Sequence, residues 1–492
     1  MGGAYRRGAL VVGAAFALSR LAAIRAGVRF DAGPLQAGFQ VLELSELRDD
    51  LVRSLANLHA QPPLFNLFIG LVLRAPQGWE EPLLRVVYLA MGLALALAAY
   101  SILVRLGVAV PVAVAGTLVI ALSPASILFE NWAHYDYPVT LLLCLSVLAL
   151  LRYEDGHRRR DVLVVLGLLG VLVLTRSTFQ LIWYLAWVGV LLLHRRHADW
   201  KPIAVVAALP LVAIVAVYAN TLRVAGTFTS STSLGASLAK ITTFQLPEHE
   251  RQAMVASGEL SPLALVPPYS PVAAYAEVVP AAPVTGVPVL DDELKTFPDG
   301  AYWINFNNLK YAAVSNAYLD DALHTLRNRP DAYVQGLSTA FEIFFRPPSD
   351  FFTLEHNRNQ IAGYNSFYNR VFQGVVASGE PVSGFPDVAQ QYRQGPARTA
   401  WVWVVLYAIA VLGGAAELWF GRRAPRFRPS QVVLGFLWSS VAYTMAVSNL
   451  VEVGENDRFR LYSDPLVVFL VAGLAVTWLQ RRREATGRPA LP

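Results

Sequence analysis

Charge is scarce in this sequence. Only 15% of the 492 residues are charged, while 55% are hydrophobic and the mean hydropathy is +0.43. A soluble chain of this size carries roughly 25% charged residues. The shortage excludes an ordinary water-facing surface over much of the chain, and it is explained if lipid contacts that surface instead.

Cysteine and the signatures of common cofactor sites are also missing. The single cysteine, Cys144, lies within an apolar run, so the chain forms no internal disulfide. The sequence has no glycine-rich phosphate loop of the P-loop or dinucleotide type. It also has no spacing of His, Cys and carboxylates that indicates a closed metal site. We therefore predict no resident metal; the cofactor is unknown, and a divalent cation at the substrate stays open.

The basic balance of the chain does not indicate a nucleic-acid partner. The net charge is +5 and the pI about 9.2, but the arginines occur in short clusters between apolar runs. Clusters in such positions set the topology of membrane proteins. We therefore expect the lipid bilayer, and not nucleic acid, as the partner of this surface.

Long apolar runs predict an all-α polytopic membrane protein with about ten transmembrane helices. The candidate spans are residues 10–28, 83–104, 111–129, 139–151, 162–174, 181–193, 203–218, 401–420, 431–451 and 465–479. We expect the first to be retained as an anchor, because no clear cleavage site follows it. Residues 62–73 begin with Pro-Pro and are too few to cross, so they predict a juxtamembrane or half-inserted helix.

These spans place every arginine cluster on the cytoplasmic side, which predicts a multi-pass protein of the cell membrane with both termini cytoplasmic. The chain then divides into three parts. Residues 1–220 form an N-terminal transmembrane catalytic module that includes a first outer loop, 29–82. Residues 221–398 form a large extracytoplasmic loop, and residues 399–492 form the C-terminal transmembrane helices. Two polar stretches of the large loop, 227–240 and 301–318, are expected to lie over the site.

Polar residues gather in three outer segments on one side of the membrane. Ionisable groups at a membrane are costly, so their accumulation indicates function. Carboxylates and aromatic rings suit a sugar, and arginines suit a phosphate. The side chains expected to contact substrate are His59, Gln61, Glu130, His134, Asp136, Glu455, Arg458 and Arg460, and the candidate catalytic acids are Asp31 and Asp50.

The order of these features resembles the GT-C superfamily of membrane glycosyltransferases, which use polyprenyl-phosphate sugars and include protein O-mannosyltransferases and the lipid A aminoarabinose transferase. The resemblance rests on four features: an acid after the first span (Asp31), a Pro62-Pro63-Leu64 helix start, an acidic second outer loop, and a late outer Arg-Phe-Arg run at 458–460. It covers roughly the first third of the chain and the final outer loop.

The resemblance implies a role for each matching residue. Asp31 matches the acid that acts as catalytic base or lies beside the acceptor. Glu130 and Asp136 match the second-loop acid, which binds sugar hydroxyls or a divalent cation. Arg458 and Arg460 match the residues that grip the lipid phosphate. The implied partners are a polyprenyl-phosphate sugar donor and a glycan, lipid or protein acceptor.

The sequence departs from the family pattern near the proposed base. Many members have an Asp-Glu pair after the first span, whereas Ala32 follows Asp31 here. Some have Glu-Lys before the Pro-Pro, whereas this chain has Ala60-Gln61. The pair Asp49-Asp50 lies nearer the Pro-Pro than the family acid does. The base is therefore either Asp31 or one acid of the pair.

Each candidate also has a structural interpretation. Asp31 can be a boundary charge paired with Arg29, and such exposed pairs contribute only ~0–1 kcal/mol. Asp49 and Asp50 can belong to the solvated face of an amphipathic stretch. His59 can be a helix-start or packing histidine.

Three classes of function remain. The first is a glycosyltransferase that acts on the extracytoplasmic face. The second is a lipid or small-solute transporter or flippase, which usually places ionisable groups at the midplane on broken helices. The third is an assembly protein whose large loop binds a partner. The acids lie at one surface, and acids and arginines gather in three separate loops on that side, which favours the glycosyltransferase.

Overall fold

The computed structural model describes residues 2–156, 158–194, 200–280, 282–297, 300–376, 398–420 and 430–486. Within these ranges the chain is mostly helical, and its sheet consists of two short antiparallel strands, β1 (Leu294–Thr296) and β2 (Tyr302–Ile304). The predicted all-α class is confirmed at this level. The arginine clusters at 195–196 and 422–428 lie outside the described residues.

Seven described helices are long and apolar enough to cross a membrane. They are α1 (Gly3–Arg25), α6 (Glu80–Arg105), α9 (Asp136–Gly156), α12 (Trp200–Ala225), the continuous helix Trp401–Phe420, α23 (Gln431–Leu450) and α24 (Asn456–Ala485). The helix Trp401–Phe420 comprises α21 (Trp401–Ala408), a π-helical turn at Ile409–Gly413 and α22 (Gly414–Phe420).

The predicted number of about ten spans is not confirmed. Residues predicted as further spans form α10 (Arg159–Thr175) and α11 (Leu181–His194), of 17 and 14 residues. At 1.5 Å per residue these helices are about 26 and 21 Å long, shorter than the roughly 30 Å of a bilayer core. An eighth span is present if α7 (Val110–Ala121) and α8 (Pro124–Glu130), which meet at 55°, are taken together.

The bend between α7 and α8 has a local cause. Pro124 lacks an N–H and starts α8. The Ser123 side chain caps this new helix by accepting a hydrogen bond from the Ser126 N–H. Two carbonyls near the break accept hydrogen bonds from a distant segment instead: Tyr368 Oη donates to Val119 O at 2.6 Å, and Tyr364 Oη donates to Leu122 O at 2.5 Å. The α19 helix (Ala362–Val371) thereby fastens the bend.

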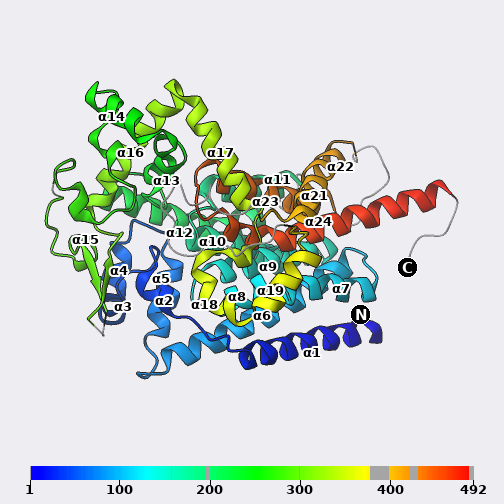
Figure 1. Ribbon diagram of the computed structural model, residues 1–492. Helices are drawn as coiled ribbons and strands as arrows, with labels where there is room; N and C mark the ends of the chain where they lie inside the picture. Colours follow the sequence, from blue (N-terminus) through cyan, green and yellow to red (C-terminus); the bar gives the residue numbers. More distant parts are fainter. Residues whose placement is uncertain are drawn as a thin grey trace.

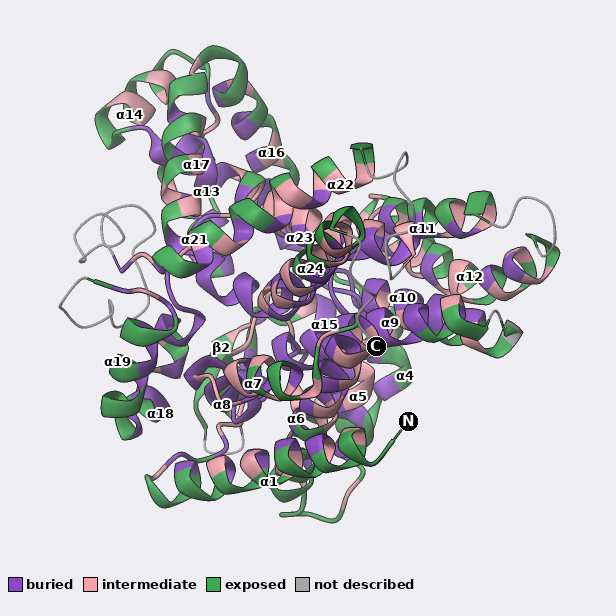
Figure 2. Cartoon of the chain, turned by 90° about the vertical axis from the view of Figure 1, so that its right-hand side faces the viewer, coloured by how far each residue is buried: buried purple, intermediate pink, exposed green. Residues whose placement is uncertain are grey.

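Large apolar side chains cover the outside of several helices. Leu10 on α1 is 73% exposed and Leu209 on α12 is 75% exposed. Figure 2 shows exposed faces along α1, α12 and α22, while buried residues gather in the centre of the bundle. An apolar outside around a packed inside is the arrangement that lipid requires.

Both described ends of the chain lie at one end of the bundle, and residues of the large predicted loop lie at the other (Figure 1). That segment contains α13 (Leu234–Ile241), α14 (Glu248–Ala256), α15 (Pro288–Asp291), α16 (Lys310–Asn328), α17 (Pro330–Phe344) and α18 (Glu355–Gln360). The segment has its own core around Tyr275, Tyr311 and Tyr318.

The first predicted outer loop folds into short helices at this same end. They are α2 (Gly33–Ala37), α3 (Leu44–Asp49), α4 (Leu51–Ala56) and α5 (Leu64–Val72). The α5 helix has nine residues and is therefore about 14 Å long. It packs on α3 and α4, in keeping with the prediction that residues 62–73 do not cross the membrane.

Candidate functional site

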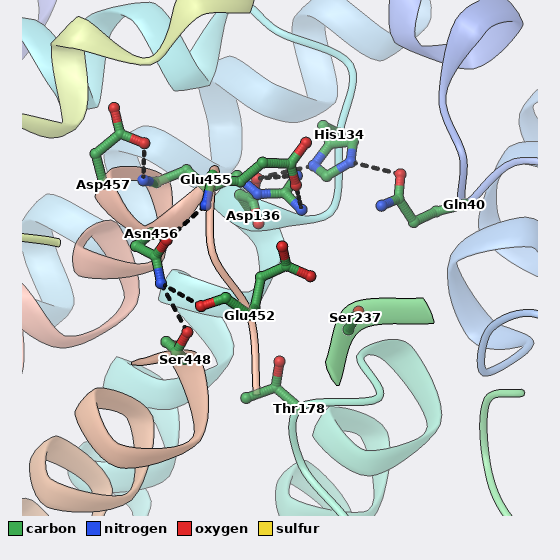
Figure 3. A network of polar contacts seen from close by, with 12 residues as sticks. Gln40, His134, Asp136, Thr178, Ser237, Ser448, Glu452, Glu455, Asn456 and Asp457 are labelled. Carbon is green, nitrogen blue, oxygen red and sulfur yellow. Dashed lines mark hydrogen bonds and ion pairs between the residues drawn. The ribbon is translucent and has the colours of Figure 1, made fainter. Parts of the chain in front are cut away.

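Two predicted outer segments meet at Asp136, the first residue of α9. Its carboxylate is buried and accepts hydrogen bonds from His134 Nδ1 at 2.9 Å and from the Tyr462 hydroxyl. Arg458 Nη1 lies 3.7 Å from the same carboxylate. Since Arg458 and Tyr462 belong to the first turns of α24, the second and last outer segments form one polar cluster (Figure 3).

The first outer segment joins this cluster through Gln40. Gln40 Oε1 lies 3.1 Å from His134 Nε2, so the imidazole is held between an amide and a carboxylate. Burial lowers the pKa of His134, although Asp136 acts in the opposite direction. The ring also stacks on Trp132, with 4.2 Å between the centroids. His134 is therefore fixed on all sides by groups from two outer segments.

Asp31 lies beside the same loop. Its N–H donates to Asn131 O at 2.8 Å, and its carbonyl accepts from the Ala133 N–H at 2.9 Å. The Asp31 carboxylate is partly exposed and accepts a hydrogen bond from the Gly33 N–H at 2.8 Å. The backbone thus places the predicted base next to the loop that carries His134, with a carboxylate that solvent reaches.

Acidic and basic side chains alternate on the other side of the cluster. Glu455 binds Arg458 Nη2 at 2.6 Å, and Lys240 of α13 forms an ion pair with Glu452. Burial tends to raise the pKa of Glu455, but Arg458, Lys240 and Arg176 outweigh it and hold the pKa below its ordinary value. The carboxylate is therefore ionised and is part of the charge balance of the site.

Arg176, at the end of α10, is a component that sequence reasoning missed. Its guanidinium lies 4.5 Å above the Tyr135 ring, and its Nε donates to Thr178 Oγ1 at 3.2 Å. Burial lowers its pKa to about 10, so it stays charged at neutral pH. The signal in the sequence was an arginine at the outer end of a predicted span, against the usual preference for the cytoplasmic side.

Lys295 on β1 was missed as well. It is 2% exposed and donates to Gly38 O at 3.0 Å and Val41 O at 3.1 Å, the carbonyls on either side of Gln40. Burial lowers the pKa of Lys295 to about 7. Lys295 therefore fastens the loop that delivers Gln40 to His134.

Glu130 does not face the cluster around Asp136. It forms a buried bidentate pair with Arg20 of α1, with Nε–Oε1 at 2.9 Å and Nη2–Oε2 at 2.7 Å, and accepts from the Tyr137 hydroxyl at 3.1 Å. Arg20 also donates to Ala121 O at 2.7 Å. The pair joins α1 to the bent α7–α8 region and leaves few lone pairs for a sugar.

Arg460 is also occupied within the protein. It contacts Asp464 at 3.0 Å, Gln373 Oε1 at 2.6 Å and Arg346 O at 3.0 Å, and it is fully buried. Arg458 and Arg460 therefore point into different surroundings although they are two residues apart. Of the two arginines assigned to a phosphate by the resemblance, Arg458 is the one in the Asp136 cluster.

The remaining candidates lie around the cluster. His59 Nε2 donates to Asn307 O and its Nδ1 accepts from the Thr232 hydroxyl, both at 2.9 Å, so it connects the first outer loop to both polar stretches of the large segment. Gln61 Oε1 accepts from Ser177 Oγ at 3.1 Å. Asp50 is exposed and caps α4 through the Arg53 N–H at 3.4 Å.

The described residues provide no group of three metal-ligating side chains close enough to hold an ion. The oxygens of Asp136, the most buried acid of the cluster, are bound by His134, Tyr462 and Arg458. The donor set therefore does not fit a metal centre, and no step proposed below passes through one.

No family model and no curated protein matches this chain. Two solved structures of an oligosaccharyltransferase from Archaeoglobus fulgidus resemble it over nearly its full length. The first is AglB in complex with an inhibitory peptide and a dolichol-phosphate, with 10% identity and a TM-score of 0.37 over 96% of this chain. The second is the apo form, with 11% identity and a TM-score of 0.37 over 97%. The chain spans about half the length of these proteins, 51% and 52%.

Proposed function

We propose that the protein is an integral membrane glycosyltransferase that moves a sugar from a polyprenyl-phosphate donor to an acceptor on the extracytoplasmic face. One observation carries the proposal. Three segments predicted to lie on the same side of the membrane meet around His134 and Asp136: the Asp31 backbone pairs with Asn131 and Ala133 just before them, and Arg458 contacts Asp136.

The parts of this cluster match what such a transfer needs. A base raises the nucleophilicity of the acceptor hydroxyl, and a cation stabilises charge that develops on the leaving phosphate. Asp31 accepts one hydrogen bond, from Gly33, so lone pairs remain for the proton of an acceptor. Arg458, which contacts Asp136 at the start of α9, supplies the positive charge. Attack by the acceptor opposite the phosphate would invert the anomeric centre.

The buried groups around these two residues hold them in place. The Asp136 carboxylate accepts hydrogen bonds from His134 and Tyr462 and forms an ion pair with Arg458. These contacts fix the start of α24 against the start of α9. The pairing of Asp31 with the 131–133 backbone then sets the distance between base and cation. Such fixed positions are the source of most catalytic advantage in displacement reactions.

The test is transfer by the full-length protein in proteoliposomes. A panel of polyprenyl-phosphate sugars is supplied with peptide, glycan and lipid acceptors, and donor consumption is followed. We expect release of polyprenyl phosphate with at least one donor, loss of that release in Asp31→Asn, and normal release in Glu277→Gln, an exposed acid of the outer segment with no contact in the described part.

The proposal fails if the folded protein consumes no donor of the panel. Movement of a labelled lipid or solute across the same liposomes would then favour the transporter. Turnover that is equal in the wild type and in Asp31→Asn would keep the transferase but remove Asp31 as its base.

A further inference from the structure

In the described part of the chain, four arginines are buried at or near the ends of the apolar helices α1, α10 and α24, and three of them have a carboxylate within ion-pair distance. Arg20 has Glu130, Arg458 has Glu455 and Asp136, and Arg460 has Asp464. Arg176 is 7% exposed, and no carboxylate of the described residues lies within 4.0 Å of it. A buried cation without a counter-charge is costly.

Arg176 also lacks hydrogen-bond partners for most of its donors. Within the described chain only its Nε has a partner, the Thr178 hydroxyl at 3.2 Å. The two terminal nitrogens have none, although guanidinium groups in buried surroundings normally use their donors. Those two nitrogens form the fork that binds two oxygens of a phosphate or carboxylate side by side.

The surroundings place the Arg176 guanidinium beside the proposed site. Tyr135, on whose ring the guanidinium rests at 4.5 Å, belongs to the loop between His134 and Asp136. Arg176 and Arg458 also lie over the same Phe459 ring, at 5.4 and 5.1 Å. Two cations near one ring repel each other, and the carboxylates beside them, Glu455 and Asp136, are both paired with Arg458.

We infer that Arg176 is the principal phosphate-binding residue of the site, and that it binds two oxygens of the substrate phosphate while Arg458, near the same Phe459 ring, adds a second positive charge. The identification of that phosphate as part of a polyprenyl-linked donor rests on the proposed function. The binding of a phosphate oxyanion rests on the unpaired guanidinium alone. Arg460, which the resemblance had assigned to this task, is saturated by Asp464, Gln373 and Arg346.

The experiment measures binding by the full-length protein in lipid nanodiscs. The probes are polyprenyl monophosphate, inorganic phosphate and inorganic pyrophosphate, and the readouts are the Kd and the ligand-induced rise in Tm. We expect Arg176→Gln to weaken binding about 10- to 100-fold, because charge-assisted contacts to an anion are lost. Arg176→Lys keeps the charge without the fork and should lie between.

Two further variants guard against misfolding. Arg223→Gln, at the outer end of α12, removes an exposed arginine that contacts Ala56 O and Asn220, and it should bind as the wild type does. Thr178→Val leaves Arg176 in place but removes the acceptor of its Nε, and it should weaken binding several-fold with an unchanged Tm in the absence of ligand.

The outcomes separate cleanly. If polyprenyl phosphate binds with Arg176 dependence and inorganic phosphate does not compete, the site takes a lipid-linked phosphate; if both bind with that dependence, it takes the phosphate group itself. Equal Kd values for the wild type and a folded Arg176→Gln protein would overturn the inference. Arg176-dependent binding without any sugar transfer would instead leave the inference standing and remove the proposed function.

Discussion

Tyr462 donates a hydrogen bond to Asp136 across 326 residues of sequence, and the two residues lie near the starts of the last and the third of the seven long apolar helices described. This bond fastens α24 to α9 at the end of the bundle where the outer segments meet. It connects the helix that carries Arg458 with the helix start that follows His134. Removing the Tyr462 hydroxyl therefore tests whether this hydrogen bond holds the two helices together.

Tyr462→Phe should lower the free energy of unfolding by about 1.5–3 kcal/mol, the usual contribution of a hydrogen bond to a charged group. Transfer should fall too, because Arg458 and His134 would no longer be held at a fixed separation. Tyr333→Phe is the matched control, since its hydroxyl donates to Leu450 O in an exposed position. Chemical denaturation in detergent gives the first quantity. Equal stability of the two variants would contradict the prediction.

Glu130 should prove structural rather than substrate-binding. Glu130→Gln leaves the buried Arg20 uncompensated, which costs roughly 3–5 kcal/mol. We expect a lower yield of folded protein but an unchanged KM and kcat per folded molecule. The double variant Arg20→Met with Glu130→Leu removes both charges and should recover much of the stability. A folded Glu130→Gln protein with a raised KM would restore the substrate-binding role expected from the sequence.

The sequence predicted the parts of this protein that depend on long apolar runs, which form helices long and apolar enough to cross a membrane. The polar segments around Asp31, Asp136 and Arg458 were expected on one side, and they do meet. The predicted number of spans is not confirmed, because α10 and α11 lie in apolar runs but have only 17 and 14 residues. Hydropathy marks where lipid is tolerated, and it does not fix where a helix ends.

The roles of individual residues in the site could not be predicted from apolar runs. Glu130 and Arg20 are 110 residues apart, and no local pattern connects them. The pair Arg460 and Asp464 did carry a signal, since residues four apart share one face of a helix. Arg176 carried only the signal of an arginine at the outer end of a predicted span, because the absence of an ion-pair partner is a property of the folded chain.

His59 predicts a loss of stability in mild acid. Burial lowers its pKa to about 4, against about 6.5 in an unfolded chain. Between these values the unfolded state binds a proton that the folded state does not, so stability is full above pH 6.5 and falls as the pH drops toward 4. The total loss is about 3 kcal/mol, since each unit of pKa corresponds to roughly 1.4 kcal/mol.

The measurement is the difference in unfolding free energy between the wild type and His59→Gln across pH 4–7. The slope of the wild type should be steeper by up to one proton, because carboxylates elsewhere contribute equally to both proteins. The variant will be less stable at pH 7, where the bonds to Thr232 and Asn307 are intact in the wild type. Parallel curves would show that His59 does not titrate on unfolding.

The choice between Asp31 and Asp50 as base can be decided by kinetics. Asp31→Asn keeps the shape of the side chain and its hydrogen bond from Gly33, and it removes the proton acceptor. If Asp31 is the base, kcat should fall by roughly 10²–10⁴-fold with little change in donor binding. Asp50→Asn preserves a capping group for α4, since Asn caps as well as Asp, and should leave kcat near the wild-type value.

The two variants should also differ in the conditions that restore their transfer rate. An acceptor whose hydroxyl is already ionised needs no base, so an acceptor of lower pKa, or a higher assay pH, should recover part of the rate of Asp31→Asn and have no such effect on an Asp50 variant. A merely structural role for Asp31 would lower the yield of folded protein without this dependence on the acceptor. If Asp50→Asn is inactive and Asp31→Asn turns over normally, the base lies on α4, and the geometry that places Asp31 beside the His134 loop serves only to hold the two outer segments together.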